Sequence, residues 1–272
     1  MLKIAHSEIY QHPLPEKHRF PMEKYQLLPE QLLYEGLVEK GNFFAPKPVS
    51  VEDILSTHEA SYWQKLKELN LTKLEIRKTG FPLSAKLVER EITIVGGTIE
   101  CAIFSQEYGA AMNIAGGTHH SFTNRGEGFC LLNDQAIASN YLIKNNLSQR
   151  ILIVDLDVHQ GNGTAQIFGG NKKVFTFSMH GRDNYPIKKE QSDLDIGLED
   201  GIEDKAYLSY LEEGLEKVWQ LHRPDFVFYQ SGVDILCTDK LGRLGVSLDG
   251  CRKRDELVLQ KCFLHQNHVW QI

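Results

Sequence analysis

From residue 134 onward, short apolar runs alternate with longer stretches of helical periodicity, and few architectures accommodate this alternation. Alternating strands and helices form a parallel sheet with helices on both faces, and ligands bind beyond the carboxyl ends of its strands. We therefore predict an α/β fold of three layers, α/β/α, around a central, mostly parallel sheet. The expected elements are a helix at 134–145, a strand at 150–156, a short helix at 164–168, a strand at 173–178, a helix at 204–221, a strand at 225–231, a helix at 251–265 and a strand at 268–272.

The first half of the chain is expected to add a layer of helices. The expected elements there are helices over 31–39, 51–69 and 84–108 and a short strand over 111–115. The longest helix contains Gly96 and Gly97, a pair that costs helix propensity and therefore indicates close backbone packing. No repeat or Pro-, Gly- or Ser-rich linker interrupts the middle of the sequence, which favours a single domain over residues 1–272.

Charge and composition narrow the function classes. The 30 basic and 36 acidic residues give a net charge of −6, so neither a nucleic-acid partner nor a membrane partner is expected. The longest basic run, Arg252-Lys253-Arg254, is expected on a solvated helix face. No segment approaches the roughly 20 apolar residues of a membrane span, and residues 1–10 lack a secretory apolar core. We expect a soluble, cytoplasmic protein.

The cysteines are odd in number, scattered, and never spaced Cys-x-x-Cys, which argues against both a disulfide framework and a thiolate zinc cluster. They are Cys101, Cys130, Cys237, Cys251 and Cys262.

A buried strand followed by Asp155, Asp157 and His159 is the strongest chemical signal in the chain. Alternation along a strand would place these three side chains on one side, where two carboxylates and an imidazole are unfavourable without a cation. The alternative is a strand that ends in a polar turn capped by Asn162. Because three ionisable groups converge, we predict a metal site with Asp157 and His159 as ligands and Asp155 behind them.

Two adjacent histidines, His119 and His120, follow Gly116-Gly117 just past the strand at 111–115. The histidines can be turn filler, or they can supply a general base and a charged partner near neutral pH. The glycines allow the backbone to approach a substrate closely.

Asp234 emerges where the strand at 225–231 ends. Alone it reads as a helix cap or turn residue. Together with Asp157 and His159 it completes a three-ligand site that leaves one coordination position open for water or substrate.

Two aromatic segments have an ordinary structural interpretation by themselves. Gly126 to Asp134 can be a tight turn around a core residue, Phe129, and Tyr185-Pro186 can be a turn as well.

These segments, in this order and spacing, resemble the histone deacetylase family within the arginase/deacetylase fold, from the N-terminal helices to about His265. The likeness is greatest to the class IV and related bacterial deacetylase-like branch, because Gln160 and Asn162 stand where class I members usually carry His and Asp. The resemblance implies one Zn²⁺ held by Asp157, His159 and Asp234.

The resemblance also implies the remaining roles. His119 and His120 would flank the metal-bound water, Asp155 would hydrogen-bond His119, and Asn162 would orient His120. The walls of the channel for the acylated lysine stem would be formed by Gly128, Phe129 and Tyr185. A structural K⁺ site would use backbone carbonyls of Asp155, Asp157 and His159 together with Ser178.

The implied reaction is amide hydrolysis on acyl-lysine or a related acylated amine, in which the metal activates water and a histidine removes its proton. Family members continue into a glycine-rich loop ending in a tyrosine that bonds the oxyanion, whereas this sequence stops at Ile272, C-terminally short of the family pattern. Losing one oxyanion donor commonly costs on the order of 10² to 10³ in turnover, so impaired activity is expected.

Two alternatives stand beside this hypothesis. The first is a catalytically silent protein that binds zinc and acyl-lysine. The second is a binuclear manganese ureohydrolase of the same fold, which generally needs a second aspartate two residues after Asp234, where this chain has Leu236. We therefore predict one metal per chain.

Overall fold

The computed structural model describes residues 1–265 and 268–271, and it divides into two compact units. Unit 1 comprises residues 1–144, and unit 2 comprises residues 145–271. Each unit is built of parallel strands and covering helices, so the architecture is three-layer α/β/α, as predicted. The prediction of a single domain over the whole chain stays a prediction.

Unit 1 contains a small parallel sheet in the order β2-β1-β3 and the helices around it. Its strands are β1 (Lys3–Ala5), β2 (Phe43–Phe44) and β3 (Ala110–Asn113). Its helices are α1 (Lys24–Tyr34), α2 (Val51–Leu55), α3 (Ala60–Lys67), α4 (Lys73–Thr79), α5 (Ala85–Tyr108) and α6 (Asp134–Lys144), with short 3-10 turns η1 (Glu8–Tyr10) and η2 (Lys40–Asn42).

The long helix α5 is the centre of unit 1 and packs on β1, β3 and α6. A Cβ atom on Gly96 would lie 1.8 Å from the carbonyl oxygen of Lys47, and one on Gly97 would lie 2.5 Å from the hydroxyl of Tyr10. The close packing predicted from this glycine pair is confirmed. Only a residue without a side chain lets these backbone segments approach so closely.

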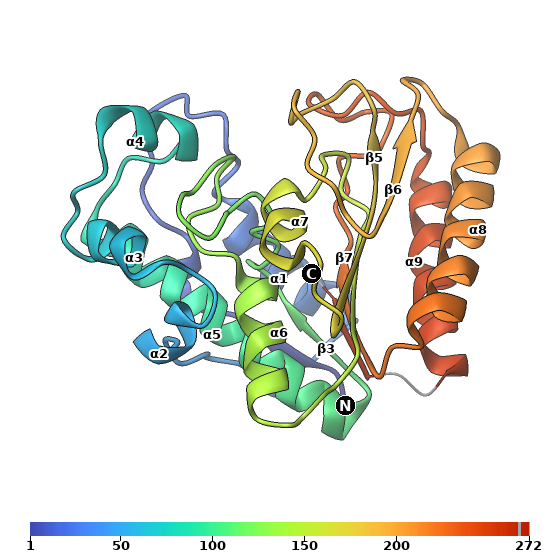
Figure 1. Ribbon diagram of the computed structural model, residues 1–272, viewed down its shortest axis with the longest axis horizontal. Helices are drawn as coiled ribbons and strands as arrows, with labels where there is room; N and C mark the ends of the chain where they lie inside the picture. The colour runs from blue at the N-terminus through green and yellow to red at the C-terminus, as the bar shows by residue number, and fades with distance from the viewer. Residues whose placement is uncertain (266–267, 272) are drawn as a thin grey trace. The chain divides into compact units, whose positions relative to one another are not determined.

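Unit 2 contains a five-strand parallel sheet in the order β8-β7-β4-β5-β6. Its strands are β4 (Ile151–Asp155), β5 (Val174–Gly181), β6 (Leu194–Leu198), β7 (Phe226–Gln230) and β8 (His268–Gln271). Its helices are α7 (Asn162–Phe168), α8 (Asp204–His222) and α9 (Leu248–Leu264). Figure 1 shows α8 and α9 side by side on one face of these strands and α7 on the other.

The core of unit 2 lies between the sheet and α8 with α9. Every residue of β4 and β7 is buried, which explains why both read as continuous apolar runs. Large buried side chains such as Phe177 and Tyr207 fill this layer. Burial of each such side chain contributes about 1.5 to 3 kcal/mol, which holds the central strands rigidly.

Several predicted elements differ from the structure. The helix expected at 31–39 is α1, which starts at Lys24 and ends at Tyr34. The helix expected at 51–69 is broken into α2 and α3, because the backbone of Glu59 is extended and its N–H donates to Thr123 O at 2.8 Å. Sequence reasoning missed the short strands β1, β2 and β6, the helix α4 and the 3-10 turns η1 and η2.

Two further expectations concern charge and the end of the chain. The basic triplet does not lie wholly on a solvated face: Arg252 and Lys253 are exposed, but the Arg254 side chain is 0% exposed. The strand predicted at 268–272 is present as β8, and Ile272 lies outside the described residues. Within residues 1–265 and 268–271, we find no helix with the length and apolar character needed to cross a membrane.

Candidate metal centre and histidine loop

The predicted metal ligands follow two neighbouring strands of unit 2. β4 pairs with β7 in parallel, with Asp155 opposite Gln230, so the carboxyl ends of the two strands lie side by side. The turn after β4 carries Asp157 and His159, and the segment 231–234, here called the aspartate loop, carries Asp234. The alternation of side chains along the strand ends at Asp155, so the turn, and not the strand, places the side chains of Asp157 and His159.

The side chains of Asp157, His159 and Asp234 converge. One candidate ligand atom from each lies within 4.8 Å of the others. The Nδ1 atom of His159 lies 3.0 Å from Asp157 Oδ1 and 3.1 Å from Asp234 Oδ2. The Val158 N–H donates to Asp234 Oδ1 at 2.9 Å, and the His159 N–H donates to Asp157 Oδ1 at 2.8 Å. The two carboxylates are thus oriented by the backbone.

The electrostatics of this trio reflect two carboxylates around one imidazole. Burial by itself lowers the pKa of His159, but hydrogen bonds and charge from Asp157 and Asp234 outweigh it and raise the pKa to about 10. Burial, followed by the charge of Asp157, raises the pKa of Asp234 to about 6. The two carboxylates therefore favour a positive charge between them.

A divalent cation suits the same donor set. Two carboxylate oxygens and one imidazole nitrogen are ordinary Zn²⁺ ligands, and three protein ligands leave a position open. Asp155 is buried behind the trio and accepts the Asp157 N–H at 3.2 Å, so it fixes the turn. Asn162 begins α7 and accepts the Gly163 N–H at 3.0 Å.

The aspartate loop approaches Asp157 very closely at Gly232. A Cβ atom on Gly232 would lie 2.5 Å from Asp157 Oδ2 and 2.7 Å from Asp157 Cα. Real side-chain atoms do not approach so near, so Gly232 is required for this contact.

Unit 1 carries the histidine pair on residues 116–121, here called the histidine loop. The rings of His119 and His120 are buried, with centroids 4.0 Å apart. Asp134, at the start of α6, accepts the Thr118 N–H at 2.8 Å, the Gly117 N–H at 3.2 Å and the Thr118 hydroxyl at 2.7 Å. One fully buried carboxylate therefore fixes the loop that presents both imidazoles.

Phe129 and Gly128 form a strained turn beside the histidine loop. Both have positive φ, 66° at Phe129 and 53° at Gly128, and a non-glycine residue in this region is uncommon. The Phe129 ring packs against Phe20 and Phe81 at centroid distances of 5.1 and 5.2 Å. A Cβ atom on Gly128 would lie 2.7 Å from Cδ2 of His120.

Tyr185 lies in unit 2 on residues 182–193, here called the tyrosine loop. Its ring is 6.1 Å from that of His159 in an edge-on arrangement. Gln160 joins this loop to the turn after β4, because its Nε2 donates to Glu190 O at 2.8 Å and its Oε1 accepts the Glu190 N–H at 2.9 Å.

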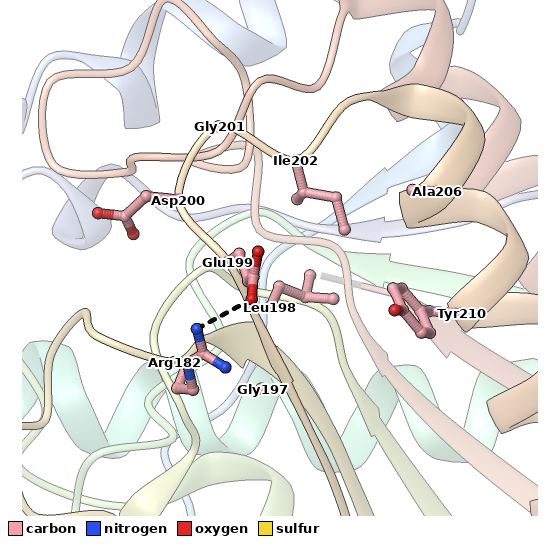
Figure 2. Close-up of a pocket in the computed structure, with 9 residues that line it drawn as sticks. All are labelled: Arg182, Gly197, Leu198, Glu199, Asp200, Gly201, Ile202, Ala206 and Tyr210. Atoms are coloured by element: carbon pink, nitrogen blue, oxygen red, sulfur yellow. Dashed lines mark hydrogen bonds and ion pairs between the residues drawn. The ribbon is translucent and has the colours of Figure 1, made fainter.

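A separate pocket of about 430 Å³ opens in unit 2 between the end of β6 and the first turns of α8 (Figure 2). Arg182 donates to Glu199 at 3.2 Å within it, and Asp200 pairs with Arg243 at 3.1 Å. Its charges are already paired, and no residue predicted for the site lines it.

The outcome for the predicted site is therefore resolved unit by unit. Unit 2 brings together Asp157, His159 and Asp234, with Tyr185 beside them, and unit 1 brings together His119 and His120 with Gly128. The contacts predicted from Asp155 to His119 and from Asn162 to His120 join residues of different units and stay predictions, as does the K⁺ site. Sequence reasoning missed Phe20, Phe81 and Arg254; the last shares a helical face with Cys251 and Val258, a spacing that signals burial.

Comparisons with known proteins identify the family and the fold of the chain. Residues 18–269 match the histone deacetylase domain. A solved HDAC homologue from Aquifex aeolicus superposes with a TM-score of 0.86 at 25% identity, covering 99% of this chain and 78% of that one. A structure of an HDAC homologue complexed with SAHA superposes equally well, with a TM-score of 0.86.

Relatives in sequence come from several organisms. An uncharacterised protein of Picosynechococcus sp. is 46% identical over 95% of this chain and 86% of its own length. Histone deacetylase 2 of Arabidopsis thaliana is 32% identical, and the match covers 89% of this chain and 65% of the plant protein. The acetoin utilization protein AcuC of Staphylococcus xylosus is 27% identical over 89% of this chain and 69% of its own length. The match over most of the sequence shows that the chain belongs to the histone deacetylase family.

Proposed function

We propose that this protein is a zinc-dependent deacylase that hydrolyses the amide of acyl-lysine or of a related acylated amine. The observation that carries the proposal is the convergence of two aspartates and one histidine within 4.8 Å after two adjacent strands. Membership of the histone deacetylase family and the SAHA complex of a structural neighbour support the reaction class. We expect the protein to act in the cytoplasm, on a free or protein-borne amine rather than on nucleic acid.

In this proposal Asp157, His159 and Asp234 hold one Zn²⁺, which supplies Lewis-acid polarisation of the amide and a more acidic water. The protein groups do the rest. His119 and His120 take the proton of the attacking water and return it to the leaving amine. Asp155 and Asn162 orient these imidazoles, and Gly128, Phe129 and Tyr185 line the path of the lysine stem and exclude water from it.

Turnover of a fluorogenic acetyl-lysine peptide by zinc-loaded protein tests the proposal. We expect activity that a chelator removes, that Zn²⁺ restores, and that His120→Ala lowers by about 10² or more while zinc affinity is retained. Asp234→Asn should lower zinc affinity as well.

Binding of the peptide without turnover would instead favour a silent acyl-lysine-binding protein. Elemental analysis adds a second check, since the proposal requires one metal per chain and a ureohydrolase requires two. A panel of acyl lengths then identifies the preferred substrate.

A further inference from the structure

Arg254 differs from the other basic residues of α9. Arg252 is paired with Asp249 and Glu256 at the surface, and its side chain is 69% exposed. The Arg254 side chain is 0% exposed, although it is only two positions away. Burial of a guanidinium costs several kcal/mol unless its donors are satisfied, so the partners of Arg254 reveal what this charge does.

The guanidinium of Arg254 donates to the backbone of the aspartate loop. Its Nη1 donates to Gly232 O at 2.5 Å, and its Nη2 donates to Ser231 O at 3.3 Å. These two carbonyls lie between the last residue of β7 and Asp234. A planar fork that binds two successive carbonyls fixes both the position and the direction of the peptide units between them.

The same loop sets the geometry of two predicted ligands. Asp234 is two residues beyond Gly232, and the Gly232 backbone rests against Asp157, where a Cβ atom would lie 2.8 Å from Asp157 Cβ. A shift of the aspartate loop by a few tenths of an ångström therefore displaces Asp234 and the surface that supports Asp157.

A half-buried carboxylate, that of Asp255, holds Arg254 itself in place. Its Nε donates to Asp255 Oδ1 at 2.9 Å, and the Tyr229 hydroxyl donates to the same oxygen at 2.5 Å. Tyr229 belongs to β7, the strand that leads into the aspartate loop. The network therefore joins α9, β7 and the loop in one chain of charge-assisted hydrogen bonds.

We propose that Arg254 is a positioning residue for the metal centre. It holds the aspartate loop so that Asp234 and Asp157 meet His159 at bonding distance. This inference rests on the proposed zinc site but not on the proposed reaction. Arg254 lies behind the loop carbonyls, and its role is to limit their motion rather than to touch substrate.

Zinc affinity of the metal-free protein tests the role, measured by competition with a chromophoric chelator. We expect Arg254→Met to weaken Zn²⁺ binding by about 10- to 100-fold, the usual effect of losing a group that orients a ligand. Arg254→Lys, which keeps the charge but not the planar fork of donors, should restore part of the affinity. Arg252→Met on the same helix is the matched control and should bind Zn²⁺ like the wild type.

Stability is measured on the same variants in the presence of chelator. A folded Arg254→Met protein with wild-type zinc affinity would overturn the proposal, whatever its melting temperature. If Arg254→Met fails to fold, Asp255→Asn decides the question, because it loosens the guanidinium while leaving its carbonyl contacts possible. We expect that variant to bind Zn²⁺ several-fold more weakly, and unchanged affinity would refute the role.

Peptide turnover is recorded separately from zinc affinity. A wild type that binds one Zn²⁺ but does not hydrolyse the peptide refutes the deacylase and still allows Arg254 to be judged. A wild type that binds no Zn²⁺ refutes both proposals.

Discussion

The histidine loop of unit 1 and the aspartate loop of unit 2 are fixed by buried charges of opposite sign. In the histidine loop the backbone turns N–H groups inward, and the Asp134 carboxylate accepts them. In the aspartate loop the backbone turns carbonyls inward, and the Arg254 guanidinium donates to them. The direction of the peptide groups in each loop thus determines which charge can hold it, because each ion satisfies several orphaned groups at once.

The two anchors also differ in how they are themselves supported. Asp134 accepts a further hydrogen bond of 2.7 Å from the Thr98 hydroxyl on α5, so neutral donors surround it. Arg254 is neutralised by a carboxylate, that of Asp255. Because several buried donors share the Asp134 carboxylate, its loss leaves all of them without an acceptor, and we expect unit 1 to be the more sensitive of the two to loss of its anchor.

Removal of Asp134 should have the largest effect. Asp134→Ala leaves the N–H groups of Gly117 and Thr118 and two threonine hydroxyls without their acceptor in a buried site. We expect the free energy of unfolding to fall by about 3 to 5 kcal/mol, measured by urea denaturation. Asp249→Ala, at an exposed carboxylate with surface ion pairs, should lower the free energy of unfolding far less. Equal costs at the two positions would show that Asp134 does not anchor the loop.

Acid should loosen unit 1 through His58. Its Nε2 accepts the Asn133 N–H at 3.0 Å and its Nδ1 lies 2.9 Å from Phe122 O, so the neutral ring carries its proton on Nδ1. Burial lowers the pKa of His58 from 6.5 to about 4. Between pH 6.5 and pH 4, His58 is protonated in the unfolded chain but stays neutral in the folded chain. The contribution of His58 to the free energy of unfolding is therefore fully present above pH 6.5 and is lost as the pH falls toward 4.

The loss attributable to His58 is about 3 kcal/mol when complete. It is measured as the free energy of unfolding at pH 7 and pH 4.5 in wild type and His58→Gln, which removes the titrating group. The variant should show a smaller difference between the two pH values. An identical difference would mean that His58 does not couple protonation to folding. No comparable titration is available to the Arg254 guanidinium, which stays charged throughout this range.

Each loop has a close contact that only glycine allows: Gly232 lies against Asp157, and Gly128 lies against His120. Substitution of these two glycines should distinguish effects on metal binding from effects on catalysis. Gly232→Ala places a methyl group against Asp157, so we expect about 10-fold weaker zinc binding and a stability cost of about 1 to 3 kcal/mol. Gly128→Ala places it against His120 at a positive φ, so turnover should fall while zinc affinity is retained. Isothermal titration with Zn²⁺ and peptide turnover distinguish them. Loss of zinc affinity in Gly128→Ala would contradict this division.

Sequence reasoning succeeded where chemistry follows from local rules. The carboxyl ends of neighbouring parallel strands lie together, so side chains that follow two such strands are predicted to converge. The side chains of Asp157, His159 and Asp234 do converge. It failed where a residue depends on a distant contact. The break between α2 and α3 depends on Thr123, and the packing around Phe129 depends on Phe20 and Phe81. Neither contact leaves a periodic signal.

The prediction for Arg254 was wrong for a different reason. A basic triplet was interpreted by its composition, as a solvated helix face, although its third residue lies on the apolar side of the helix with Cys251 and Val258. Helical position carries more information here than the sign of the charge, because burial is decided by the face on which a residue lies.

The smallest effect is expected at Gln160, which holds the tyrosine loop. Phe129 is held by aromatic packing with Phe20 and Phe81, whereas the tyrosine loop is tied to the turn after β4 by hydrogen bonds of Gln160. Gln160 bonds both backbone groups of Glu190, and its Nε2 also donates to Asp195 Oδ1 at 2.8 Å. Gln160→Met fills the same volume without these bonds, so it should cost about 1 kcal/mol of stability. Because the loop that positions Tyr185 becomes more mobile, KM for the acyl-lysine peptide should rise more than kcat falls. Lys188→Met, an exposed change in the same loop, is the control. A fall in kcat at constant KM would instead place the effect of Gln160 at the neighbouring His159, and the tyrosine loop would no longer be the element that it controls.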